Sequence, residues 1–151
     1  MQPKITVMLI MARERRLPLL EALESCGFDA LPVCDCREAR RILETEPKVQ
    51  VVLTDTVLPD GDWRRVLEIV AHRCPNIEVV VSSRFDDHKL WIDVLEQGAY
   101  DVLVEPYERE EVRRIVETAA DKSSMRSLPP AGAMSYKTRV ARTAGVGTVT
   151  L

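Results

Sequence analysis

The residues VVLTDTVLPDG (residues 51–61) carry the pattern that decides the fold. They belong to an apolar run, residues 49–54, whose β-branched side chains are typical of a buried strand. Polar Asp55 follows directly, and the Pro-Asp-Gly of residues 59–61 marks a loop. An aspartate at the end of a buried strand is costly unless its carboxylate has a partner or a function. The stretch therefore predicts one strand of a covered sheet, with Asp55 at its carboxyl end.

Outside this stretch, apolar runs alternate with segments of helical periodicity. Four more strands are expected at residues 5–11, 28–33, 77–81 and 101–104, and a helix is expected after each of the five strands. The last helix is expected from Glu108 to Ala120. This alternation predicts an α/β fold in three layers, a doubly wound, five-stranded parallel sheet with five helices on its two faces.

Polar residues follow three of the expected strands. They are Asp55, the pair Ser82-Ser83, and Glu105 with Pro106 after it. Taken singly, each has a structural explanation, because Asp55 could tie the next turn and a serine could simply end its strand. Ligands of such sheets bind at the carboxyl ends of the strands. The three positions together therefore predict one site.

The spacing of these positions is specific. Asp55, Ser83 and Glu105 are separated by 28 and 22 residues. With the second motif, LEQGAYDVLVEPY (residues 95–107), the pattern resembles the receiver domain of bacterial response regulators over residues 4–120. The resemblance implies a flavodoxin-like fold with strand order 2-1-3-4-5.

The resemblance also implies roles for individual residues. Asp55 is the phosphoacceptor, which a sensor histidine kinase phosphorylates. Ser83 is the hydroxyl that contacts the phosphoryl group, with Ser82 left as the alternative. Pro106 occupies the position of the family's cis proline.

The sequence departs from the family's pattern at three places. Where the family has an acidic pair, this sequence has Met11-Ala12, or Ala12-Arg13 if the register shifts by one residue. Glu105 stands where the family has a lysine, and Val102 replaces its aromatic switch residue. A charge-assisted hydrogen bond of the kind that the acidic pair and the lysine would form is worth about 1.5–3 kcal/mol. The domain is therefore interpreted as an atypical receiver.

Mg²⁺ is the cofactor that the resemblance implies, since hard oxygen ligands suit it. Its remaining ligands would be Asp55, the backbone of Val57 and Glu14. The missing acidic pair argues against tight binding at this site.

Three hypotheses for function follow. In the first, the chain is a response regulator that takes a phosphoryl group on Asp55 and signals to a downstream protein, with no enzymatic role beyond weak self-dephosphorylation. In the second, it is a pseudo-receiver that acts as a phosphorylation-independent interaction or dimerisation module. A homodimer would use the helix around residues 90–95, the strand 101–104 and the helix 108–120. A flavodoxin-like electron carrier is a third alternative, but residues 13–16 are Arg-Glu-Arg-Arg where a phosphate-binding loop would be needed.

Charge divides the 151 residues into two parts. Residues 1–120 hold 16 Lys and Arg against 23 Asp and Glu, whereas residues 121–151 hold 5 against 1. This predicts an acidic receiver domain over 1–120 and a basic, disordered tail over 121–151. The net charge of −3 argues against direct nucleic-acid binding. Without a signal peptide or membrane segment, and with four cysteines expected to be reduced, the protein is expected in the cytoplasm.

Overall fold

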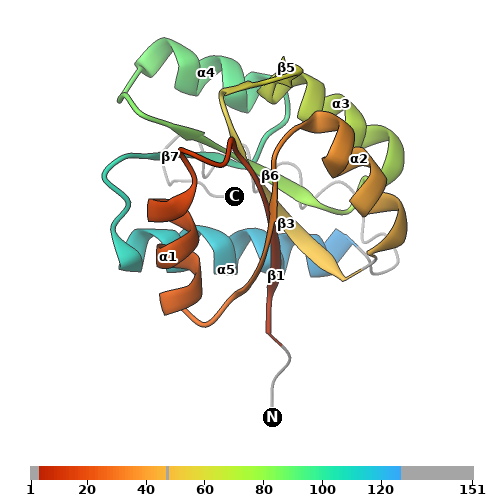
Figure 1. Ribbon diagram of the computed structural model, residues 1–151, viewed down its shortest axis with the longest axis horizontal. Coiled ribbons are helices and arrows are strands. Elements are labelled where there is room, and N and C mark those ends of the chain that lie inside the picture. The colour runs from red at the N-terminus through yellow and green to blue at the C-terminus, as the bar shows by residue number, and fades with distance from the viewer. Residues whose placement is uncertain (1–3, 47, 127–151) are drawn as a thin grey trace, which may run out of the picture.

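The fold is a parallel sheet between two layers of helices, as the alternation of strands and helices predicts. The computed structural model describes residues 4–46 and 48–126 (Figure 1). The elements are β1 (Thr6–Ile10), α1 (Leu17–Ser25), β2 (Asp29–Val33), α2 (Cys36–Thr45), β3 (Val49–Asp55), β4 (Val57–Leu58), β5 (Gly61–Asp62), α3 (Trp63–Arg73), β6 (Glu78–Ser83), α4 (His88–Glu96), β7 (Asp101–Val104) and α5 (Arg109–Arg126).

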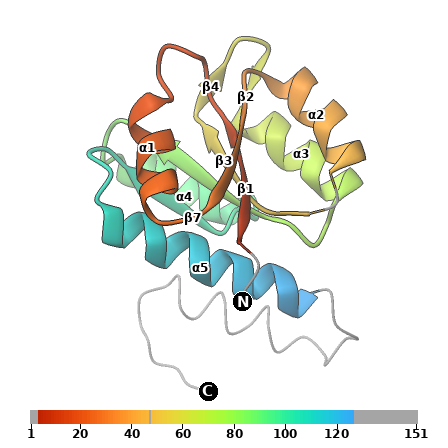
Figure 2. The ribbon, with the colours of Figure 1, turned by 60° about the horizontal axis from the view of Figure 1, so that its bottom comes forward.

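The sheet confirms the predicted topology. Its order is β2-β1-β3-β6-β7, and all neighbours are parallel. This is the expected 2-1-3-4-5 order, because β4 and β5 are two-residue strands that form a separate hairpin in the loop after β3. Helices α1 and α5 cover one face of the sheet, and α2, α3 and α4 cover the other (Figures 1 and 2).

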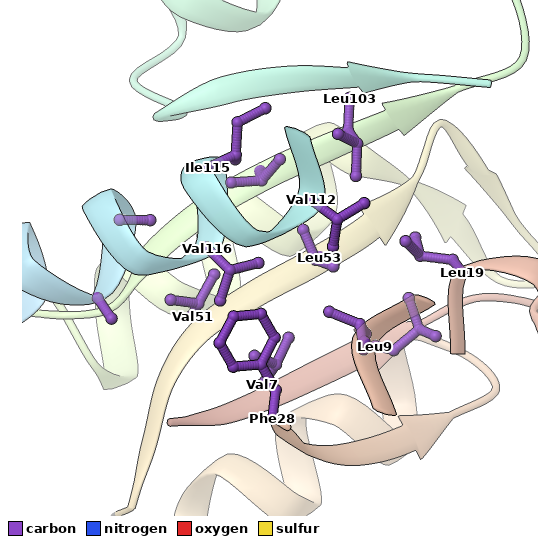
Figure 3. Close-up of a cluster of buried hydrophobic side chains, with 14 of the residues drawn as sticks. Val7, Leu9, Leu19, Phe28, Val51, Leu53, Leu103, Val112, Ile115 and Val116 are labelled. Atoms are coloured by element: carbon purple, nitrogen blue, oxygen red, sulfur yellow. The ribbon is translucent and has the colours of Figure 1, made fainter. Parts of the chain in front are cut away.

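Alternation along the central strands divides the core between the two faces. In β1, Val7 and Leu9 pack toward α1 and α5, whereas Met8 and Ile10 pack toward α2 and α3. The cluster on the α1–α5 side is the larger one, and Leu53 of β3 lies among its members (Figure 3). Strands buried on both faces need apolar residues at successive positions, which explains the continuous apolar runs in the sequence.

Helix boundaries follow the expected local signals. Asp35, Asp62 and Asp87 cap α2, α3 and α4 by accepting backbone N–H groups of the first turn. Gly27 and Gly98 follow α1 and α4 with φ of +86° and +103°, a region that favours glycine.

The last helix is longer than predicted. The sequence predicts an end at Ala120, but α5 continues to Arg126, so the first residues of the expected tail, 121–126, are helical. Ala119 and Ala120 are buried, and so are Lys122 and Ser123 beyond them. One side of the helix therefore stays buried past the predicted boundary, although the buried residues there are polar. The rest of the expected tail, residues 127–151, lies outside the described residues. None of the described helices is long and apolar enough to cross a bilayer.

Candidate functional site at the carboxyl edge of the sheet

Asp55 ends β3 at the edge where the loops after β1, β6 and β7 also lie. Its side chain is only 1% exposed. In the register between β3 and β6, Leu53 pairs with Val80 and Asp55 pairs with Ser82. Leu53 and Val80 both pack on the α1–α5 side. Two residues further along each strand, Asp55 and Ser82 fall on that same side.

The two oxygens of Asp55 have different surroundings. Oδ1 accepts a hydrogen bond from the Thr56 amide at 2.8 Å. Oδ2 lies 3.2 Å from Nε of Arg15, but it is buried and accepts no hydrogen bond within the described residues. The interaction with Arg15 is therefore an ion pair of unfavourable hydrogen-bond geometry. A buried carboxylate oxygen with an unmet acceptor costs about 1–3 kcal/mol.

The charge state of Asp55 reflects this environment. Burial raises the pKa of its carboxyl above the ordinary aspartate value, and Glu105 adds to the rise. The Thr56 amide and the guanidinium groups of Arg15 and Arg84 favour the charged form, but they do not fully offset burial. Desolvation is thus the dominant effect at this carboxylate.

Arg15 is a residue of the candidate site that the sequence interpretation did not single out. The resemblance points to Glu14 as a metal ligand, yet Glu14 is exposed and its neighbour Arg15 meets Asp55. A tight turn, in which the Arg15 amide donates to the Ala12 carbonyl at 3.0 Å, sets this orientation. The only signal in the sequence is an arginine-rich segment directly after a strand that ends at the same edge.

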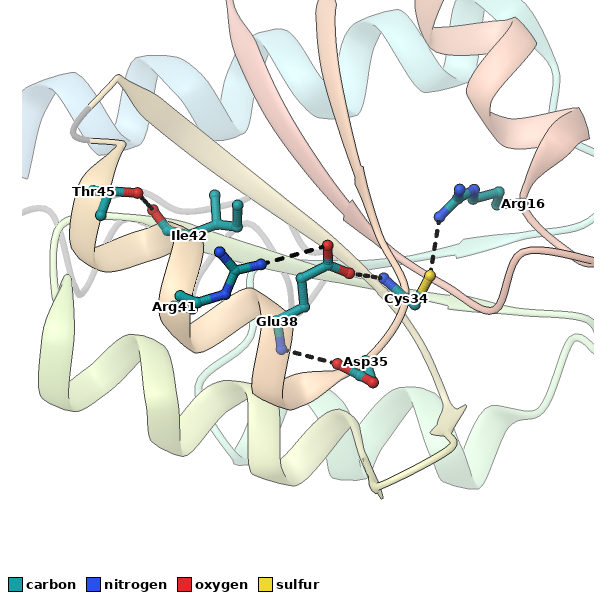
Figure 4. Close-up of polar contacts among 7 residues, drawn as sticks. All are labelled: Arg16, Cys34, Asp35, Glu38, Arg41, Ile42 and Thr45. Atoms are coloured by element: carbon teal, nitrogen blue, oxygen red, sulfur yellow. Dashed lines mark hydrogen bonds and ion pairs between the residues drawn. The ribbon is translucent and has the colours of Figure 1, made fainter.

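The loop that carries Arg15 also contacts the segment between β2 and α2. Arg16 donates to Sγ of Cys34 at 3.8 Å (Figure 4). The Cys34 amide in turn donates to Oε1 of Glu38, and the Glu38 amide donates to the N-cap Asp35 (Figure 4). These hydrogen bonds hold the loop after β1 against the start of α2.

The two candidate hydroxyls separate onto different partners. Ser82, on the side of Asp55, forms a hydrogen bond of 2.5 Å with the hydroxyl of Tyr107. Ser83 instead bonds the backbone of Phe85, donating to its carbonyl and accepting from its amide. Burial raises the pKa of Tyr107, and the charges of Glu105 and Asp55 raise it further. Tyr107 is therefore a second site residue that the sequence interpretation did not single out.

The segment after β7 has the predicted proline geometry. The Glu105–Pro106 peptide bond is cis, as the resemblance implies. The Glu105 amide donates to the Ser83 carbonyl at 3.0 Å, which ties the end of β7 to β6. Val102 lies in a small apolar cluster with residues of α3, α4 and β6, including Trp63.

The residues at this edge do not suit a magnesium ion. Across residues 4–46 and 48–126, no group of three or more His, Cys, Asp or Glu side chains could hold a metal ion. Met11 is buried where the family places an acidic ligand, and the cationic Arg15 faces Asp55. Val57 lies in β4 with an exposed side chain, and the role of its backbone stays a prediction.

The loop after β3 is held by a second aspartate. Asp60 accepts hydrogen bonds from the amides of Cys36 and Arg37 at 2.8 and 3.0 Å. Burial works against the charged form of Asp60, but the amide hydrogen bonds outweigh it and lower its pKa. Asp60 thus joins the loop that follows Asp55 to the N-terminus of α2, where a negative charge is favourable.

Known proteins resemble this chain in sequence. Residues 14–117 match the family model of the response regulator receiver domain. The two-component response regulator-like protein APRR3 of Arabidopsis thaliana is 33% identical over 96 residues, which cover 62% of this chain and 19% of that protein. The response regulator protein PilR of Pseudomonas aeruginosa is 32% identical over 92 residues, covering 61% and 20%. The chain therefore spans about a fifth of the length of these two relatives.

The fold has close counterparts among solved structures. The receiver domain of the Francisella response regulator 1452 superimposes with a TM-score of 0.69 at 21% identity, over 80% of this chain and 99% of that one. At this identity the match concerns the fold alone.

Proposed function

Because the chain belongs to the response regulator receiver family, we propose that it is a signalling module that works by protein contact. Asp55 is held in an ion pair by Arg15 and is not switched by Mg²⁺-dependent phosphorylation. The observation that carries this proposal is the 3.2 Å approach of Arg15 to Asp55 Oδ2 at a buried position. A cation supplied by the chain itself takes the place of a bound one.

The surroundings of Asp55 support the same proposal. Phosphoryl transfer to a carboxylate brings several negative charges together, so the site must supply positive charge. Glu105 adds a negative charge where the family has a lysine, and its effect on the pKa of Asp55 is unfavourable to the charged form. Val102 is packed among apolar residues and has no ring that could rotate with a change at the site.

Exposed apolar side chains at the same edge supply a contact surface. Leu17, Val57 and Phe85 are 58%, 68% and 72% exposed, and they follow β1, β3 and β6 respectively. Apolar side chains that gather into one exposed patch mark protein contact sites. We therefore place a downstream protein partner at this edge.

A second candidate function is phosphorylation of Asp55 by a sensor histidine kinase, with weak self-dephosphorylation. The observation in its favour is Oδ2, which is buried and lacks a hydrogen bond within the described residues, so it could act as the nucleophile once Arg15 moved. Arg15 and Arg84 would then have to supply the positive charge. Ser83 would contact the phosphoryl group only after leaving Phe85, and Ser82 only after leaving Tyr107.

Two further parts of the proposal concern assembly and location. A homodimer would form through α4, β7 and α5, where Ile92 is 39% exposed. A cytoplasmic location agrees with the four free cysteines at positions 26, 34, 36 and 74. Direct binding of nucleic acid or membrane is not part of the proposal.

The experiment is an intact-mass measurement after incubation with Mg²⁺ and acetyl phosphate, with a conventional receiver domain in the same tube to verify the donor. We expect the conventional receiver to gain a phosphoryl group and this chain to gain none. A phosphoadduct that is present in the natural chain and missing in Asp55→Asn would overturn the proposal in favour of the second candidate. Repetition with Arg15→Ala tests whether the ion pair is what blocks the reaction.

A further inference from the structure

A groove lies on the molecule away from the edge that carries Asp55. Helices α2 and α3 pack side by side over one face of the sheet (Figures 1 and 2). Between them is a groove of about 370 Å³, here called the α2–α3 groove. One residue of α2 and five of α3 line it: Arg40, Arg65, Glu68, Ile69, His72 and Arg73.

The α2–α3 groove has the opposite charge to the rest of the body. Its lining contains three arginines and one glutamate. Helices α2 and α3 together contain six arginines and three glutamates. Residues 1–120 as a whole carry a net charge of −7. A positive strip on an acidic domain attracts negatively charged ligands to one place and repels them elsewhere.

Two of the three arginines of the groove form surface ion pairs with glutamates, and the third forms none among the described residues. Arg65 contacts Glu68 at 3.3 Å, and Arg73 contacts Glu44 of α2, both at the surface. Exposed pairs of this kind contribute little and exchange readily for other partners. Arg40 has no ion pair with any carboxylate in the described part of the chain.

The length of the α2–α3 groove favours a peptide over a single small anion as its ligand. Arg65, Ile69 and Arg73 are four residues apart on α3, so they lie in one row on the helix. The row spans roughly 12 Å at about 1.5 Å per residue, which matches about four residues of extended chain. Ile69, at 6% exposure, forms an apolar floor between the two charged ends.

We propose that the α2–α3 groove binds an extended acidic segment of a partner protein, with carboxylates on the arginines and an apolar residue over Ile69. The planar fork of arginine suits carboxylate groups. This inference goes beyond the proposed function, because it holds whether or not Asp55 accepts a phosphoryl group.

Charge also argues against residues 121–151 of the same chain as the ligand of the α2–α3 groove. Residues 121–151 carry 5 Lys and Arg against 1 Asp. A segment of that composition is repelled by the arginines of the groove. The ligand must therefore be an acidic segment from outside this part of the chain.

The experiment uses the full chain labelled with ¹⁵N and the peptide Glu-Glu-Leu-Glu-Glu, blocked at both ends, as the probe. We expect amide chemical-shift changes confined to α2 and α3, and none with the matched peptide Lys-Lys-Leu-Lys-Lys. The double variant Arg40→Glu/Arg65→Glu should weaken binding at least about tenfold. Arg114→Glu, an exposed arginine of α5, is the matched control and should bind as the natural chain does.

Four results would overturn the proposal. They are the absence of shifts at millimolar peptide, shifts that map elsewhere, an equal loss of binding in Arg114→Glu, and displacement of the peptide by an equal concentration of inorganic phosphate. Sedimentation of the same samples adds one more outcome. Self-association that the double variant abolishes would assign the groove to a second copy of this chain and contradict the partner proposed here.

Discussion

Leu53 and Asp55 lie two residues apart on β3 and are equally buried, at 0% and 1% exposure, yet their environments are opposite. Leu53 is surrounded by apolar side chains of the α1–α5 cluster (Figure 3). Asp55 has one amide donor and an ion pair that completes no hydrogen bond with Oδ2. Burial stabilises the fold at the first position and opposes it at the second. Side chains in the interior of the sheet therefore stabilise the fold. The buried carboxylate of Asp55 at the carboxyl edge destabilises it, so its presence requires an explanation other than stability.

The largest expected effect tests the interior. Leu53→Ala should lower the free energy of unfolding by about 3 kcal/mol, because it removes apolar packing and leaves a cavity in a closely packed cluster. Urea denaturation followed by tryptophan fluorescence measures the change. A decrease below about 1 kcal/mol would show that the cluster around Leu53 collapses easily and would weaken the contrast with Asp55.

The next effect has the opposite sign. Asp55→Asn should raise the free energy of unfolding by about 1–2 kcal/mol near pH 7, because it removes a buried charge that desolvation disfavours. The raised pKa of Asp55 sets the pH dependence. The folded state binds this proton more tightly than the unfolded state, so the natural chain loses stability as pH rises from the ordinary aspartate pKa through the raised one. The gain in Asp55→Asn should therefore vanish near pH 3.5 and be complete above the raised pKa.

Two controls sharpen this result. Asp86→Asn, at an exposed position, should change the stability by less than about 0.5 kcal/mol at either pH. In an Arg15→Gln background the stabilisation by Asp55→Asn should increase, since the cation that favours the carboxylate is gone. A loss of stability in Asp55→Asn at neutral pH would mean that the ion pair outweighs desolvation.

A smaller effect concerns the second aspartate of the same loop. Asp60→Ala should cost about 1 kcal/mol at neutral pH, because two amides at the start of α2 lose their acceptor. The pKa of Asp60 is lowered, so this contribution is present above the ordinary aspartate pKa and is lost as pH falls through the lowered one. Urea denaturation of the natural chain and of Asp60→Ala at neutral and acidic pH measures this change in the free energy of unfolding. Its pH dependence should be opposite in sign to that of the contribution of Asp55. An equal cost at both values of pH would show that charge on Asp60 is not what stabilises α2.

The smallest expected effect is that of Mg²⁺. A ligand that binds the folded state raises the thermal unfolding midpoint. Because we expect no Mg²⁺ binding at Asp55, millimolar Mg²⁺ should leave the midpoint of the natural chain unchanged. Differential scanning calorimetry with and without EDTA makes the measurement. A rise in the midpoint that disappears in Asp55→Asn would reveal a metal site at the edge and reverse the inference drawn from Arg15.

The sequence alone determined the fold and the position of Asp55. Parallel strands that are covered on both faces must be continuously apolar, so the five runs, their order along the chain and the polar residue ending the third are all readable from composition and period. The cis peptide bond before Pro106 is implied by the family resemblance alone, and it is observed. The end of α5 is six residues beyond its predicted position at Ala120, because helical periodicity does not define where a helix stops.

Only the tertiary structure decided which side chains meet Asp55. In an irregular turn, a shift of one residue changes which side chain points toward the site. Arg15 therefore contacts Asp55, whereas its neighbour Glu14 is exposed. The pairing of Ser82 with Tyr107 and the α2–α3 groove depend on strand register and helix packing, which join residues far apart in the chain. Residue types and spacing predict that the strand ends meet at one edge, but they do not define these individual contacts, because each contact joins two segments that only folding brings together.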